Sequence, residues 1–107
     1  MIFIETSFFT RRIIELLSDD EYRELQSSLV ENPKKGLVIP ATGGLRKIRW
    51  SGSGRGKRGG SRIIYYWATT KQQILMLFIY AKNEKDDLSP EQRKSLKQIV
   101  EKEYHER

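Results

Sequence analysis

The chain has 107 residues, no cysteine and a formal net charge of +6 at pH 7. A chain of this length can bury one core without metal or disulfides, so we expect a single domain over residues 1–107. The lack of cysteine excludes disulfides, thiolate zinc sites and thiol catalysis. No signal-like sequence opens the chain, and the longest apolar run, residues 74–81, is far shorter than the roughly 20 residues of a spanning helix. We therefore expect a cytoplasmic protein with no membrane partner.

The charges are unevenly distributed along the chain. No acidic residue occurs in the 52 positions between Glu31 and Glu84, and this stretch holds 11 lysines and arginines. The rest of the chain has nine such cations against 14 acidic residues. A basic middle segment of this kind predicts a surface that binds a polyanion, with a plain solvated basic face as the alternative.

The first third of the chain predicts a strand and two helices. Residues 1–6 are rich in β-forming side chains, and the apolar residues that follow recur at helical spacing, with Thr6 or Ser7 as the N-cap. A second helix begins at the capping box of Ser18 and Glu21. It ends at Asn32-Pro33, because the residue before a proline avoids the α region. The two helices would form a hairpin with an apolar seam.

The rest of the chain predicts three strands and a closing helix. A turn at Gly43-Gly44 precedes a strand over about residues 45–50, and "SRIIYYWATT" and "QQILMLFIYAK" predict the other two strands. Because the three strands are close in sequence, an antiparallel meander is their simplest pairing. In the last helix Ser89 is the N-cap, Pro90 the first helical residue, and Gln92 completes a capping box. This order of elements predicts an α+β domain.

A glycine-rich stretch, "WSGSGRGKRGGSR" at residues 50–62, lies between the first two of these strands. It satisfies the pattern G-x-G-x-x-G, but that pattern binds dinucleotides only where a helix follows, and here a strand follows. A flexible hairpin loop would explain the glycines but not the clustered cations. We therefore expect a loop that contacts phosphates and becomes ordered on binding, through Arg55, Lys57 and Arg58.

Several cations on the predicted strands would share one face of the sheet. Lys47 and Arg49 are two residues apart on a strand, so their side chains point the same way. A concave cationic sheet with some aromatic side chains suits an RNA backbone and stacked bases, whereas ordinary sheet packing is the alternative for the aromatics. The further members of this surface would be Arg62 and Tyr66 on the second strand, and Lys82 and Lys85 after the third.

Three segments resemble the HigB branch of the RelE/ParE toxin superfamily: "NPKKGLVIPATGGLRKIRW", "GRGKRGGSRIIYYW" and "IYAKNEKDDLSPEQRKSLK". The resemblance covers nearly the whole chain. It implies a compact RelE-like fold, in which an N-terminal strand and a helical hairpin pack on a curved antiparallel sheet that a C-terminal helix completes. It also implies a type II toxin that a HigA-type helix-turn-helix antitoxin neutralises, and that reaches operator DNA only through the antitoxin complex.

The activity that the resemblance implies is ribosome-dependent cleavage of mRNA in the A site of the 30S subunit, beside 16S rRNA. The ribose 2′-OH attacks the adjacent phosphate without metal or cofactor, and preplaced cations stabilise the charge that develops on the phosphate oxygens. The family pattern implies catalytic roles for Arg62, Lys47, Arg49, Lys82 and Lys85. We expect RNA or ribosome contacts from Arg46, Arg55, Lys57, Arg58 and Tyr66.

The general base stays open at the level of sequence. Some RelE-type toxins have a tyrosine after the last strand, where this chain reads "KDDLSP", and neither Tyr80 nor Tyr104 matches that position. His105 lies near the C-terminus, where chain ends often fray, and we expect it to have no catalytic role. The acidic residues Glu84, Asp86 and Asp87 are interpreted as a solvated run, so we expect no metal site.

Two other functions remain as alternatives. A ParE-like relative of the same fold would inhibit DNA gyrase, although a toxin directed at a protein needs no row of cations on its sheet. A non-catalytic RNA-binding module is the second alternative.

Overall fold

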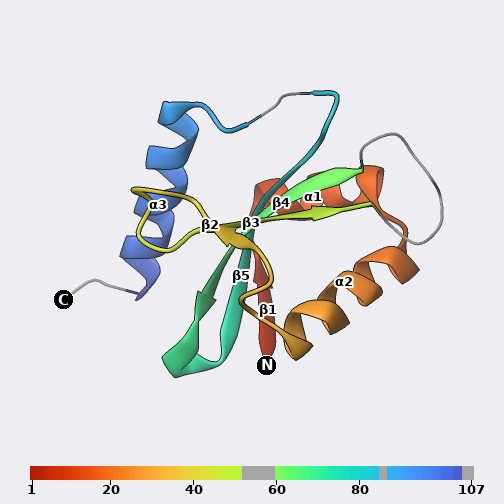
Figure 1. Ribbon diagram of the computed structural model, residues 1–107, viewed down its shortest axis with the longest axis horizontal. Helices are drawn as coiled ribbons and strands as arrows, with labels where there is room; N and C mark the ends of the chain where they lie inside the picture. Colours follow the sequence, from red (N-terminus) through yellow and green to blue (C-terminus); the bar gives the residue numbers. More distant parts are fainter. Residues whose placement is uncertain (52–59, 85–86, 105–107) are drawn as a thin grey trace.

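Three helices and five strands make up residues 1–51, 60–84 and 87–104, which are the residues that the computed structural model describes (Figure 1). This combination of helices and strands confirms the predicted α+β fold class. The short strand β2 was not among the predicted elements. In chain order the elements are β1 (Ile2–Glu5), α1 (Ser7–Leu16), α2 (Asp19–Glu31), β2 (Leu37–Val38), β3 (Arg46–Trp50), β4 (Ser61–Ala68), the 3-10 turn η1 (Thr69–Lys71), β5 (Gln73–Ala81) and α3 (Pro90–Tyr104).

The strands form one sheet in the order β1-β5-β4-β3-β2. The predicted antiparallel meander of β3, β4 and β5 is confirmed, and β2 adds to it antiparallel to β3. The sheet as a whole is mixed, because β1 pairs parallel with β5. A parallel pair needs a long connection between its strands, and here the helical hairpin and the meander provide it.

The helix starts agree with the capping signals in the sequence. Thr6 is the N-cap of α1, and its side chain accepts a hydrogen bond from the backbone N–H of Phe9. The capping box of α2 is complete, with both Ser18–Glu21 hydrogen bonds present. Ser89 and Gln92 form the same reciprocal pair at the start of α3. Each box satisfies backbone N–H groups that a helix start would otherwise leave unpaired.

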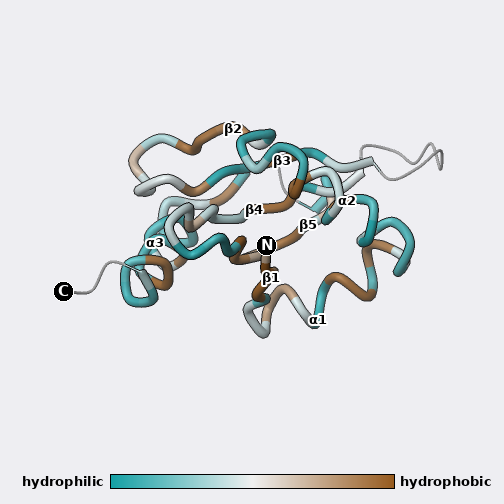
Figure 2. The backbone as a smooth tube through the Cα atoms, turned by 90° about the horizontal axis from the view of Figure 1, so that it is seen from below, coloured by the Kyte–Doolittle hydropathy of each residue, from teal (hydrophilic) through white to brown (hydrophobic). Residues whose placement is uncertain are grey.

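The sheet separates two hydrophobic cores. Helices α1 and α2 cover one face, where Phe9 and Leu25 pack against Ile63 and Tyr65 of β4. Helix α3 covers part of the other face, where its side chains pack against Ile64 of β4 and its neighbours. Figure 2 shows hydrophobic residues gathered on the central strands of the sheet. The fully apolar sequence of β5 follows from this arrangement, because its side chains enter both cores.

Tyr65 ties the segment after α2 to the sheet. Its side chain is fully buried, its hydroxyl donates to the carbonyl of Pro33 at 2.7 Å, and it accepts the N–H of Gly36 at 2.9 Å. A Cβ on Gly36 would lie 2.9 Å from the Tyr65 ring, so only glycine fits this approach. Ordinary sheet packing, the alternative for the aromatic residues of β4, therefore holds for Tyr65.

Within the described part of the chain, no helix has the length and apolar character needed to cross a membrane.

Candidate functional site

Three cations lie together on the sheet face that α3 only partly covers. The strand register places Arg49 of β3 directly opposite Arg62 of β4, and Arg62 opposite Tyr80 of β5. Lys47 lies two residues before Arg49 and shares its side of β3. This is the face beneath α3, because Ile64 and Tyr80, which lie opposite Lys47 and Arg62 in the strand register, belong to the core that α3 covers. We call Lys47, Arg49 and Arg62 the cation row.

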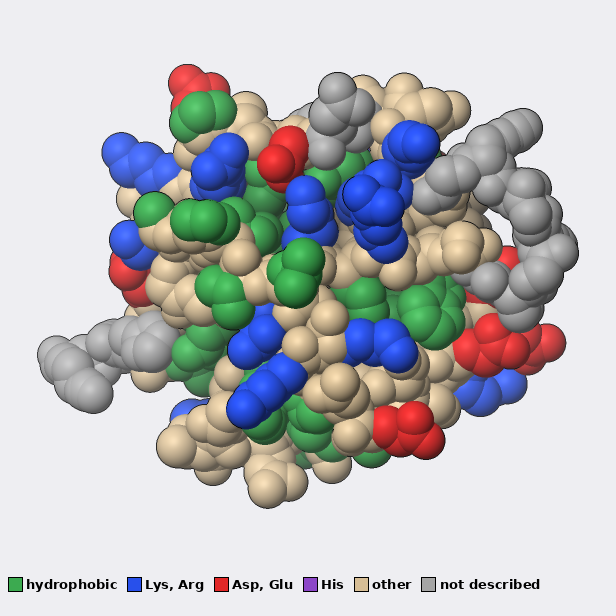
Figure 3. Space-filling model, in the orientation of Figure 1, with side chains coloured by type: hydrophobic (Ala, Val, Ile, Leu, Met, Phe, Trp, Pro, Cys, Tyr) green, Lys and Arg blue, Asp and Glu red, His purple; other side chains and the backbone are tan. Residues whose placement is uncertain are grey.

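The turn after β5 brings a fourth cation close to this row. The backbone N–H of Lys82 donates to the carbonyl of Gly60 at 3.1 Å, which joins the turn to the residue before β4. Gly60 is two residues before Arg62, so this hydrogen bond holds the backbone of Lys82 near Arg62. The side chain of Lys82 is exposed. Figure 3 shows lysine and arginine side chains in both the upper and the lower half of this face of the molecule.

The members of the cation row differ in their access to solvent. Arg49 is exposed and Lys47 is half-buried, whereas Arg62 has only 8% of its surface accessible. A buried guanidinium is stable only when neighbouring groups satisfy it. Arg49 and Lys47 can contact an incoming phosphate directly. Arg62 can contact a phosphate only through the small exposed part of its side chain, or after its neighbours have moved.

Lys47 has a carboxylate partner inside this surface. Its Nζ lies 3.3 Å from Oδ1 of Asp87, and the same oxygen accepts the backbone N–H of Leu88 at 2.8 Å. The Leu88 hydrogen bond, then Lys47 and the nearby charge of Arg93, hold the pKa of Asp87 below its ordinary value against a smaller opposing effect of burial. Asp87 is thus ionised at neutral pH, and this solvent-exposed carboxylate also pairs with a member of the cation row.

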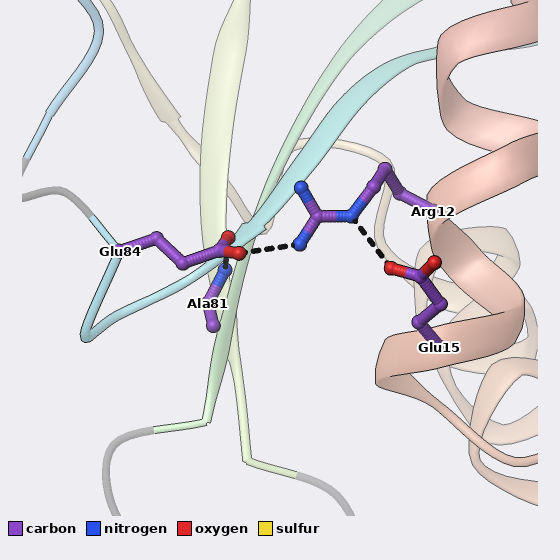
Figure 4. Close-up of polar contacts among 4 residues, drawn as sticks. All are labelled: Arg12, Glu15, Ala81 and Glu84. Carbon is purple, nitrogen blue, oxygen red and sulfur yellow. Dashed lines mark hydrogen bonds and ion pairs between the residues drawn. The ribbon is translucent and has the colours of Figure 1, made fainter.

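An ion pair from the other side of the sheet holds the turn after β5. Arg12 of α1 lies between Glu15, at 3.2 Å, and Glu84, at 2.7 Å (Figure 4). The second carboxylate oxygen of Glu84 accepts the backbone N–H of Ala81 at 2.9 Å. Glu84 therefore closes the turn that carries Lys82 and connects it to α1. Sequence reasoning missed this pair, because its two residues are 72 positions apart.

Two predicted RNA contacts, Arg46 and Tyr66, have packing or hydrogen-bond partners outside the cation row. Arg46 follows the strand alternation to the opposite face from Lys47, where its guanidinium donates to the carbonyls of Gly36 at 2.8 Å and Lys34 at 3.3 Å. These bonds hold the Arg46 side chain away from the cation row, and its contact with RNA or the ribosome stays a prediction. Tyr66 shares the face of the cation row but packs beneath α3, with its ring centroid 5.5 Å from that of Tyr104.

The tyrosines considered as a general base are poorly placed for that role. Tyr80 is almost completely buried. The Tyr104 hydroxyl donates to Gln73 at the far end of β5, and burial, helped by the charge of Glu103, raises the pKa of Tyr104 above its ordinary value. A raised pKa makes proton removal from this hydroxyl harder at neutral pH. The remaining candidates Arg55, Lys57, Arg58, Lys85, Asp86 and His105 lie outside the described residues.

Among residues 1–51, 60–84 and 87–104, no group of three or more histidine, aspartate or glutamate side chains is arranged to hold a metal ion.

Two comparisons relate this geometry to known proteins. A family model described as the RelE toxin of the RelE/RelB toxin-antitoxin system matches residues 5–106. The chain belongs to the RelE toxin family. A structure of the E. coli toxin RelE, a double arginine-to-alanine variant in the free state, is similar to this RelE-family toxin with a TM-score of 0.56. The two share 13% sequence identity over 79% of this chain and 86% of that chain, which shows the common fold.

As a RelE-family protein, the chain is the toxin of a toxin-antitoxin pair and has an antitoxin as its partner. The cation row gives this toxin a surface where two or more positive charges can approach one phosphate group. Charges fixed before the substrate arrives stabilise developing negative charge without the cost of reorganisation. The arrangement is therefore suited to binding an RNA backbone and to stabilising a phosphate that gains charge.

Proposed function

We propose that this toxin is a HigB-type endoribonuclease, which cleaves mRNA in the A site of the 30S ribosomal subunit and so inhibits translation. The supporting observation is the cation row, aligned by the β3–β4 register on a face that α3 leaves partly open, in a chain of the RelE family. A single domain of residues 1–107 would carry this activity in the cytoplasm. Its partners would be the ribosome, mRNA and a HigA-type antitoxin, and the antitoxin would mediate any contact with operator DNA.

The reaction needs no metal ion or cofactor in this proposal. The ribose 2′-oxygen forms a bond to the adjacent phosphorus as its proton leaves to a base, and the bond from phosphorus to the 5′-oxygen breaks as that oxygen takes up a proton. The products are a 2′,3′-cyclic phosphate and a 5′-hydroxyl end. Arg49 and Lys47 would stabilise the non-bridging oxygens, which carry the most charge in the transition state.

The other predicted site residues have supporting roles in the same proposal. Arg62 would contact the scissile phosphate after a local rearrangement of its buried side chain, and Lys82 would add a cation from the turn after β5. Lys85 would act beside it, and the loop cations Arg55, Lys57 and Arg58 would contact the RNA or rRNA backbone.

Mapping of RNA ends tests this function. The purified toxin is added to a reconstituted translation reaction and, separately, to the same mRNA without ribosomes. We expect new 5′-hydroxyl ends within codons only in the translated sample, and these ends require phosphorylation before they can be ligated. Intact translated mRNA would overturn the proposal, and DNA breaks with intact mRNA in toxin-expressing cells would favour gyrase as the target.

A further inference from the structure

A pocket of about 450 Å³ opens between the start of α1 and the first turns of α3. Its apolar lining comes from Phe8 of α1, Phe78 of β5 and Leu96 of α3. Polar side chains from the first turns of α3, among them Ser95 and Glu91, complete the wall. A mainly apolar cavity with a few polar groups is typical of a site for a flat organic ring.

The pocket lies near the cation row in the sheet, with the buried side chain of Tyr80 between them. The ring centroid of Phe78 lies 5.8 Å from that of Tyr80, and Tyr80 is directly opposite Arg62 in the sheet. A second link runs along the chain. Asp87 pairs with Lys47, and the pocket residue Ser89 is two positions after Asp87. A nucleotide whose phosphate lies at the cation row therefore has its base within reach of the pocket.

Phe8 is unusually exposed for a large aromatic residue at the mouth of a pocket. About half of its surface, 52%, is accessible to solvent. The guanidinium of Arg11 lies 5.6 Å from the ring centroid, so a cation–π contact covers part of the ring and favours one orientation. An exposed, oriented aromatic ring beside a cationic groove is the usual means by which proteins stack single-stranded bases.

We infer that this pocket binds one unstacked nucleobase of the mRNA held by the cation row, with Phe8 and Phe78 as its stacking surfaces. The inference rests on the proposed function, because it takes RNA to be the substrate. Ser95 and Glu91 supply hydroxyl and carboxylate groups that can contact the edge of the base. The pocket would thus contribute a base preference next to the cleavage site, which the cation row cannot supply because phosphates are the same at every nucleotide.

Substitutions of Phe8 test the pocket in the reconstituted translation reaction. Phe8→Ala should lower the cleavage rate at subsaturating mRNA by about tenfold and flatten the base preference beside the cut, since alanine removes one stacking surface. Phe8→Trp should keep both properties. Ile14→Ala is the matched control, because Ile14 is a 78% exposed apolar residue on the same helix and does not line the pocket. This control should cleave like the unchanged toxin.

A second variant and a direct probe keep the test independent of Phe8. Ser95→Trp should fill the pocket from α3 and reproduce the loss without touching α1. A 2-aminopurine base placed beside a 2′-O-methyl cleavage site should change its fluorescence with the unchanged toxin and not with Ser95→Trp. Unaltered cleavage and base preference in both variants would overturn the inference, and a loss of antitoxin binding alone would assign the pocket to a protein segment. If the unchanged toxin cleaves no mRNA, the proposed function has failed instead.

Discussion

The two faces of the sheet perform different tasks with the same strands. The face beneath α1 and α2 is a continuous apolar core from Phe9 to Ile79. The opposite face is apolar only beneath α3, and becomes cationic where β3 and β4 extend past the helix towards Arg49 and Arg62. The first face stabilises the fold, and in the proposed function the open end of the second face binds an anion. Substitutions on the two faces should therefore separate stability from activity.

The largest effect is expected on the α1–α2 face. Phe9 is fully buried, so Phe9→Ala should lower the free energy of unfolding by about 3–5 kcal/mol, through lost burial and the cavity that remains. Urea denaturation followed by circular dichroism measures the change. The partly exposed Phe78→Leu on the other face should cost much less, and equal losses would contradict the division between the faces.

The cation row should show the reverse pattern. Arg49→Ala should reduce mRNA cleavage by about 100-fold, because it removes a charge that stabilises the transition state. Its free energy of unfolding should change by less than about 0.5 kcal/mol, since the side chain is exposed. Arg23→Ala, an exposed arginine on α2, is the matched control. Similar cleavage by both variants would remove Arg49 from the mechanism.

The Arg12–Glu84 pair connects α1 to the turn that carries Lys82, and its loss should have a modest effect on both stability and activity. Glu84→Gln should cost at most about 1 kcal/mol of stability, because the pair is partly exposed and solvent-screened. Cleavage should fall by about fivefold as the turn carrying Lys82 loosens, an effect of about 1 kcal/mol on the barrier. A double-mutant cycle with Arg12→Ala measures the coupling in both properties. Additive effects on cleavage would show that the pair does not position the turn.

The smallest effect is a dependence of stability on pH at Asp87. The hydrogen bond from the Leu88 backbone N–H, followed by the pair with Lys47, lowers the pKa of Asp87 in the folded state. The ionised carboxylate therefore stabilises the fold at neutral pH, and this contribution is lost as the pH falls through the lowered pKa. Urea denaturation across the acid range should therefore show a weaker pH dependence in Asp87→Asn than in the unchanged protein. Parallel curves would show that Asp87 contributes no linkage.

Local signals in the sequence predicted most of the elements. The capping residues Thr6, Ser18 and Ser89 mark the helix starts because a cap depends on residues only three positions away. The meander of β3, β4 and β5 was predictable since neighbouring strands usually pair. The parallel pairing of β1 with β5 was not predictable, because it joins residues 71 positions apart, such as Ile2 and Gln73, and depends on how the helices pack.

The candidate site was predicted in part for the same reason. Strand alternation placed Lys47 and Arg49 on one face, and the same alternation, applied to Arg46, would have assigned that residue to the other face. The partner of Lys47 could not be predicted, because Asp87 is 40 residues away and approaches only through the path of the chain before α3. The burial of Arg62 also depends on packing between distant segments.

The pairing of Arg49 with Arg62 has a consequence for the protein in the absence of RNA. Two like charges directly opposite each other on antiparallel strands disfavour the folded state. An anion bound between them would relieve this repulsion, and any ligand that binds only the folded state raises its stability by an amount that grows with the logarithm of the free ligand concentration. The melting temperature of the toxin should consequently rise with added polyanion, so that heat resistance reports on occupancy of the site without any chemical step.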